Sequence, residues 1–268
     1  MNRIALFLLL LCGCAARTPA PSSHHRAAPA SWGLVTLAKP IDPDAPGAGM
    51  APFIFQQAAA GGPIRILGQI SPVGQNPEAD LSRSVVYWSK DFLNIRGRLH
   101  ARYTYEWCSA GPVRVAGVRV VLDSAGLPVI WELLPATSGE AASFYMSSGL
   151  EMAAAREYPA PTDGRRFAVE TANREVEVAD LVADAPMPMG PMICQDPQGN
   201  VLQLQSRCMP IPPAQLISEN YYEWQPLAAE TKRKLDALQA AAGATPGFYT
   251  DSSDAGSLEQ ILNLPKDF

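Results

Sequence analysis

Sulfur-bearing side chains gather in the second half of the chain, in an arrangement that could bind a soft metal ion. Thioether and thiolate sulfurs are ligands that favour Cu(I). The candidate copper ligands are Met187, Met189, Met192, Cys194, Cys208 and Met209. Methionine also fills irregular gaps in apolar cores, so the alternatives are a loop that packs on the protein or a loop that contacts a partner.

A second candidate site is a run of basic side chains at every other position, Arg96, Arg98, His100 and Arg102. Residues two apart in a strand point to the same side, so these four form one row. Such a row could bind anionic glycans, lipid headgroups or an acidic partner. The interpretation that we favour is an exposed face neutralised by Asp and Glu of neighbouring strands or of the acidic second half.

A further cysteine follows an apolar segment at the N-terminus. Arg3 precedes the apolar run 4–11, which has the length of a signal-peptide core and is too short to span a bilayer. The run ends in Leu11-Cys12-Gly13-Cys14. The segment resembles the type II signal peptide of bacterial lipoproteins, with an ordinary cleaved signal peptide as the alternative. The resemblance implies export, acylation of Cys14 and attachment to the membrane through that lipid, at the outer membrane and facing the periplasm.

Residues able to carry out catalysis are few. His100 is the only histidine of the predicted domain, which excludes a zinc site built on several histidines. Glu106 and Glu132 lie among aromatic and apolar residues, as do the paired carboxylates of glycoside hydrolases. Strand alternation explains both positions equally well. A carboxylate-dependent hydrolase acting on envelope glycans is therefore an alternative, and we expect no cofactor because no phosphate-binding glycine loop is present.

Charge and cysteine content limit the partners. Residues 51–135 carry eight basic and six acidic side chains, whereas residues 136–268 carry nine basic and eighteen acidic ones. An acidic chain without a basic cluster in its larger part is a poor nucleic-acid binder, so we expect no nucleic-acid partner. Cys108, Cys194 and Cys208 allow one disulfide in an oxidising compartment, and their spacing does not select the pair.

The positions of these residues depend on the predicted elements. Strict alternation predicts a half-buried strand over about 95–107, with its basic side chains exposed. Two hairpins are expected at about 113–134 and 192–208, around short turns that contain glycine. Further expected strands cover 64–70, 85–88, 166–171 and 175–178. Apolar spacing and end signals predict helices over 138–157, over 226–242 and from 257. The class is α+β, a mainly antiparallel sheet with a few helices.

Composition divides the chain into three parts. We expect a signal peptide at 1–13, a lipid-anchored linker rich in Ala and Pro at 14–52, and a single α+β domain with C-terminal helices at 53–268. Within the linker, the segment 31–38 is apolar enough to dock on the domain as a strand.

We therefore expect a lipid-anchored envelope protein that works by binding or scaffolding rather than by catalysis. Its probable partner is an envelope protein or a glycan. The candidate contact surfaces are the basic row, the Met-rich segment and the aromatic segment Asn220-Tyr-Tyr-Glu-Trp224, which could stack on a sugar or anchor the chain to its own core. A periplasmic Cu(I)-binding protein is the alternative to which the sulfur ligands point.

Overall fold

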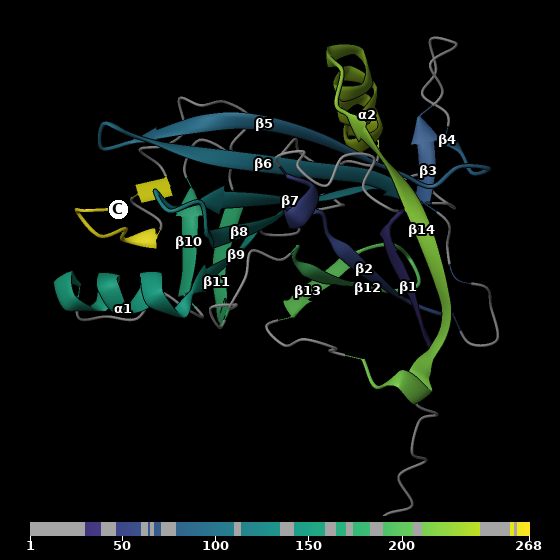
Figure 1. The fold of residues 1–268 in the computed structure, drawn as a ribbon, viewed down its shortest axis with the longest axis horizontal. Coiled ribbons are helices and arrows are strands. Elements are labelled where there is room, and N and C mark those ends of the chain that lie inside the picture. The colour runs from purple at the N-terminus through teal and green to yellow at the C-terminus, as the bar shows by residue number, and fades with distance from the viewer. Residues whose placement is uncertain are drawn as a thin grey trace, which may run out of the picture.

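The fold is α+β, with a large mixed sheet and the helices α1 (Ser148–Glu157) and α2 (Ala229–Ala241). The computed structural model describes residues 30–38, 47–59, 64, 67–70, 79–109, 114–134, 142–158, 165–169, 174–182, 190–205, 211–241, 258–259 and 262–268. Figure 1 shows α2 above the long strands β5 and β6, and α1 at the opposite end of the sheet.

The strands come from almost the whole described chain. They are β1 (Trp32–Leu37), β2 (Phe53–Gln57), β3 (Leu67–Ile70), β4 (Ala79–Asp80), β5 (Val85–Ile95), β6 (Arg98–Ser109), β7 (Arg114–Leu122), β8 (Pro128–Leu134), β9 (Ala142–Ser147), β10 (Arg165–Val169), β11 (Arg174–Val182), β12 (Met192–Gln195), β13 (Val201–Gln205) and β14 (Leu216–Pro226). Their order in the sheet is β10-β11-β9-β8-β7-β6-β5-β14-β1-β2-β12-β13, with β3 and β4 beside β6. Short 3-10 turns, η1 (Ala48–Met50) and η2 (Pro213–Gln215), complete the elements.

Strand direction is mixed, so the expected mainly antiparallel sheet is only partly right. The strands β5 to β9 form an antiparallel meander, in which β9 takes the place of part of an expected helix, and both expected hairpins are present as β7–β8 and β12–β13. Parallel pairs join β14 to β5 and to β1, β2 to β12, and β9 to β11. Parallel neighbours need long crossover connections, which residue periodicity does not reveal. The strand β1 comes from the segment assigned to the linker, so the sheet includes residues before 53.

The strand expected at 95–107 is the second half of a long hairpin. Arg96 and Gly97 both have positive φ and form a two-residue turn between β5 and β6, so β6 starts at Arg98. Left-handed φ at both central positions is typical of the type I′ turn, which matches the twist of paired strands. The polar face of β6 is not exposed as expected, because His100, Arg102, Thr104 and Glu106 are all buried.

The helix predicted over 138–157 is wrong in its first half. Residues 142–147 form β9, between β8 and β11, and Ser147 caps α1 by accepting a hydrogen bond from the Leu150 amide at 3.2 Å. Phe144 and Met146 are fully buried against the sheet. Their spacing fits one face of a strand as well as a helix, and strand pairing decides between the two. The expected strands 166–171 and 175–178 are β10 and β11, and the C-terminal helix is α2.

The sheet curls so that its distant end returns to its middle. The amide of Leu204 in β13 donates a hydrogen bond to the hydroxyl of Tyr145 in β9 at 3.2 Å. The largest core cluster lies inside this half-barrel, where Tyr105, Trp107 and Tyr222 are fully buried. On the other face of the meander, one cluster packs around α2 and another around α1 and the C-terminal residues 258–268 that are described. Both faces of β6 are therefore covered from His100 onward, whereas Arg98 and Leu99 at the turn are exposed.

Candidate functional site

The first half of the basic row binds the C-terminal segment of the chain itself. Arg96 donates from Nε to the Glu259 carboxylate at 3.0 Å and from Nη1 to the Leu264 carbonyl at 2.9 Å. Arg98 donates to the carbonyl of Asp267. Main-chain carbonyls and one carboxylate thus occupy donors that an anionic ligand would need.

The second half of the row is buried. The His100 ring stacks on Phe268 with centroids 4.3 Å apart, and its Nδ1 lies 3.1 Å from the Leu122 carbonyl oxygen. Arg102 forms a two-point ion pair with Asp91 on the adjacent strand, with 2.8 Å between Nε and Oδ1. The structure therefore satisfies the favoured expectation of internal neutralisation but not that of exposure. The open row of positive charge needed for an anionic ligand is not present in the described residues.

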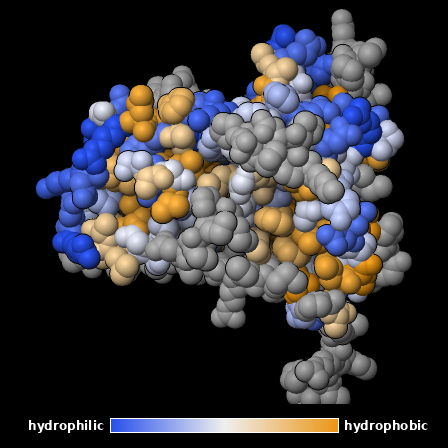
Figure 2. Space-filling model, in the orientation of Figure 1, coloured by the Kyte–Doolittle hydropathy of each residue, from blue (hydrophilic) through white to orange (hydrophobic). Residues whose placement is uncertain are grey.

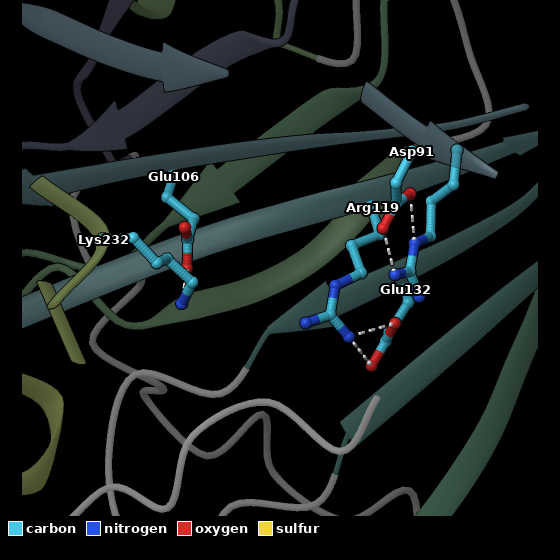
Figure 3. Close-up of polar contacts among 6 residues, drawn as sticks. Asp91, Glu106, Arg119, Glu132 and Lys232 are labelled. Carbon is cyan, nitrogen blue, oxygen red and sulfur yellow. Dashed lines mark hydrogen bonds and ion pairs between the residues drawn. The ribbon is translucent and has the colours of Figure 1, made fainter. Parts of the chain in front are cut away.

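Two more ion pairs continue across the same sheet face, and Figure 3 shows them side by side. Lys232 of α2 donates to Glu106 Oε1 at 3.2 Å, and Arg119 of β7 donates to Glu132 of β8 at 3.1 Å. Arg119 and Glu132 are both buried. Among the described residues, the second oxygen of Glu106 and the Nε of Arg119 have no hydrogen-bond partner. Buried polar groups of this kind often hold an ordered water.

The carboxylates considered for hydrolysis are thus on one face, each beside its own cation. Glu106 is on β6 and Glu132 on β8, with β7 between them. Gly117 of β7 is paired with Glu106 of β6. A Cβ at Gly117 would lie 2.6 Å from the Tyr105 carbonyl oxygen and 3.2 Å from Glu106 Cγ. Each carboxylate binds its own cation and not the other carboxylate. The geometry therefore adds no support to a paired acid–base role. Hydrolase activity stays a prediction.

Buried hydroxyl and thiol groups are held in their neutral forms. Burial raises the pKa of Cys108 to about 11 and that of Tyr87 to about 12, and it raises the pKa values of Tyr105 and Tyr222 further. The thiol of Cys108 donates to the Gly68 carbonyl at 3.0 Å. Because the thiolate is the reactive form, Cys108 is not an activated nucleophile. Cys108 and Cys194 lie in different core clusters, so the structure does not bridge these two.

The remaining candidates meet on the outer face of the curled sheet. Strand register places Tyr221 of β14 beside Thr36 of β1. On the next strands, Phe53 of β2 is paired with Met192 of β12. The strands β1 and β2 are antiparallel, and Leu34 is paired with Phe55. Two residues further along the same register, Thr36 lies beside Phe53. One row across four strands therefore contains part of the aromatic segment and part of the Met-rich segment, which are far apart in sequence.

We call this surface the outer apolar face. It comprises Trp32, Leu34, Phe53, Phe55, Met192, Cys194, Ile211 and Tyr221. Trp32, Leu34, Phe53 and Met192 are only half-buried, and Tyr221 is 59% exposed. Beside it, Ile217 of β14 is 57% exposed. Figure 2 shows hydrophobic atoms over the lower right of the view, where β1, β2 and β14 run in Figure 1.

Sequence reasoning missed Trp32, Leu34 and Phe53 as surface residues. Their apolar runs favour strands, but the runs themselves do not say which face stays open. The other two aromatic side chains of the segment face inward: Tyr222 donates to the Pro52 carbonyl at 2.8 Å, and Trp224 stacks on Trp88 with centroids 4.3 Å apart.

The proposed copper ligands are only partly placed. Met192 is half-buried and Cys194 buried within the outer apolar face. Met187, Met189, Cys208 and Met209 lie outside the described residues, as does the lipid-attachment candidate Cys14. Within the described ranges, no group of three His, Cys, Asp or Glu side chains could hold a metal ion. Copper binding through sulfur ligands is untested by this geometry and stays a prediction.

Comparisons with models of known protein families, with curated proteins and with solved structures found no match to this chain. Among the described residues, no helix is long and apolar enough to cross a membrane.

Proposed function

We propose that this chain is a lipid-anchored binding or scaffolding module of the cell envelope, and that its protein partner contacts the outer apolar face. The observation that carries the proposal is the row of large apolar side chains across β14, β1, β2 and β12, which remain half-buried or exposed. Cys14 is the proposed site of the lipid.

The composition of the face supports a protein partner. Aromatic residues and methionine are enriched in protein interfaces, and charged residues are depleted at interface centres. The outer apolar face has Trp32, Phe53, Met192 and Tyr221, with the carboxylates of Glu219 and Glu223 exposed along β14 at its border. An apolar centre with a charged border is the usual anatomy of such a contact.

The contacts of the basic row also support this choice among the three candidate surfaces. Arg96, Arg98 and Arg102 already bind Glu259, main-chain carbonyls and Asp91. A partner at that row has to displace these groups, whereas Phe53, Met192 and Tyr221 on the outer apolar face are half-buried or exposed. Apolar burial is favourable by about 25 cal/mol per Å².

The test adds charge to the face without disturbing the core. Tyr221→Asp and Ile217→Asp change exposed side chains, and Met152→Asp, at a position 60% exposed on α1, is the matched control. We expect native electrophoresis of mild-detergent extracts to show a complex with the unmodified chain and the control. The two β14 variants should lose it by roughly tenfold or more. Equal complex yields for all four chains contradict the proposed face.

The anchor is tested separately. Labelled palmitate should enter the unmodified chain and not Cys14→Ala, and equal labelling of the two overturns acylation at Cys14. This outcome leaves the face unaffected, because the charge variants report on the partner and not on the lipid.

A further inference from the structure

The β5–β6 hairpin has a second exposed apolar surface, separate from the outer apolar face. The side chains of both strands point alternately to the two faces of the hairpin. The face that contacts the half-barrel core at Tyr103 continues outward to the turn. At that end the core no longer covers it: Phe92 is 51% exposed and Leu99 is 70% exposed. Figure 1 shows the hairpin reaching the edge of the molecule, and Figure 2 shows hydrophobic atoms there bordered by hydrophilic ones.

Strand pairing makes these side chains one surface. Phe92 is opposite Ala101, and Leu99 is opposite Asn94 one step nearer the turn. Lys90, on the same side, has its ammonium 5.2 Å from the centre of the Phe92 ring and 5.3 Å from that of Tyr103. We call Lys90, Phe92, Asn94, Leu99 and Ala101 the hairpin patch.

The charge of the patch is one-sided. Among the residues of β5 and β6 that share this face, Lys90 is a cation and none is a carboxylate. Asp91 points to the opposite face, where it binds Arg102. Arg98 is on that opposite face too, where it is exposed and donates to the main-chain carbonyl of Asp267. A cation beside exposed Phe and Leu suits an anionic lipid surface.

The size of the patch also argues for a bilayer rather than a protein. A stable protein complex buries about 800 Å² on each partner, and two exposed side chains on a two-stranded ribbon fall well short of this. A lipid surface needs no matching shape, because an aromatic ring and an aliphatic side chain can enter the headgroup region individually.

We propose that the hairpin patch rests on an anionic membrane surface, with Phe92 and Leu99 in the headgroup layer and Lys90 beside lipid phosphates. The proposal rests in part on the proposed anchor, which keeps a bilayer within reach of the domain. It assigns the two apolar surfaces different occupants: lipid at the hairpin patch and protein at the outer apolar face. The domain then lies against the membrane instead of moving freely on its linker.

The experiment measures which surface contacts lipid, from the quenching of a site-specific fluorophore by brominated lipid. The full chain carrying Leu99→Cys is labelled with an environment-sensitive fluorophore and mixed with phosphatidylcholine vesicles that contain phosphatidylglycerol and brominated lipid. Ile217→Cys, 57% exposed on β14, is the matched control, and the parent chain labelled in parallel gives the background from native cysteines. We expect bromolipid to quench the label at 99 at least twofold more than the label at 217. Phe92→Ser in the Leu99→Cys chain should remove most of that difference.

Vesicle flotation, measured on the same samples, separates this proposal from the anchor. Flotation with quenching at 99 supports the hairpin contact. Flotation with equal quenching at 99 and 217 overturns it while leaving the anchor in place. Absence of both flotation and quenching overturns the hairpin contact and also the anchor.

Discussion

Individual basic residues on the sheet face are neutralised by ion pairs with neighbouring carboxylates. Arg102, Arg119 and Lys232 are each beside a carboxylate, and in the Arg119–Glu132 pair both side chains are buried. Removing one partner of a buried pair leaves an uncompensated charge, which typically costs about 3–5 kcal/mol. These pairs link β5 to β6, β7 to β8 and α2 to β6, and the Arg102–Asp91 pair makes that end of the basic row part of the structure instead of an open binding surface.

Cys108 gives a prediction about alkaline stability. Its pKa is about 11 in the folded chain against 9.0 for an ordinary thiol, so between these values the folded state keeps a proton that the unfolded state has lost. The free energy of unfolding should therefore fall as pH rises from 9 to 11, by about 3 kcal/mol from this group. Urea unfolding under reducing conditions measures it. Cys108→Ala should show a shallower decline, and parallel curves for the two chains would refute the assignment.

Elements are where sequence reasoning succeeded and failed most clearly. Short turns that contain glycine, between two apolar runs, indicated the β7–β8 and β12–β13 hairpins. Alternation found β6, β10 and β11, because a strand with distinct faces leaves a period of two. It placed 142–147 in a helix, since Phe144 and Met146 fit both periods. The position of β14 between β5 and β1 was not predictable, because pairing between distant segments depends on tertiary packing. For the same reason the meeting of Tyr221, Phe53 and Met192 on one face was missed.

The β5–β6 turn provides the prediction at this scale. Gly97 has φ +84° and open space around the position of a Cβ, so Gly97→Ala adds backbone strain without a collision. We expect a loss of about 1 kcal/mol in the free energy of unfolding. Gly49→Ala is the control, because its Cβ also meets open space and its φ is not in the left-handed range. Denaturant unfolding of the two variants decides, and equal stabilities would argue against a type I′ turn at Arg96–Gly97.

In the part of the chain that the structure describes, the molecule is a curled sheet in which Arg102, Arg119 and Lys232 are paired with carboxylates, and the outer apolar face and the hairpin patch are left open. The fold class could be predicted from the sequence, whereas the open surfaces could not, because exposure depends on which strands the sheet brings together. Burial inside the half-barrel accounts for Tyr105, Trp107 and Tyr222. It does not account for the half-buried Trp32, Phe53 and Met192, whose outward position is the basis of the proposed partner contact.

Site-specific photo-cross-linking in intact cells tests that contact most directly. A benzophenone side chain is placed at Tyr221 on the outer apolar face or at Met152 on α1, two positions of nearly equal exposure at 59% and 60%. We predict a discrete cross-linked protein adduct from position 221 and none from position 152. Adducts at both positions in equal yield, or at neither, would contradict a partner bound at the outer apolar face.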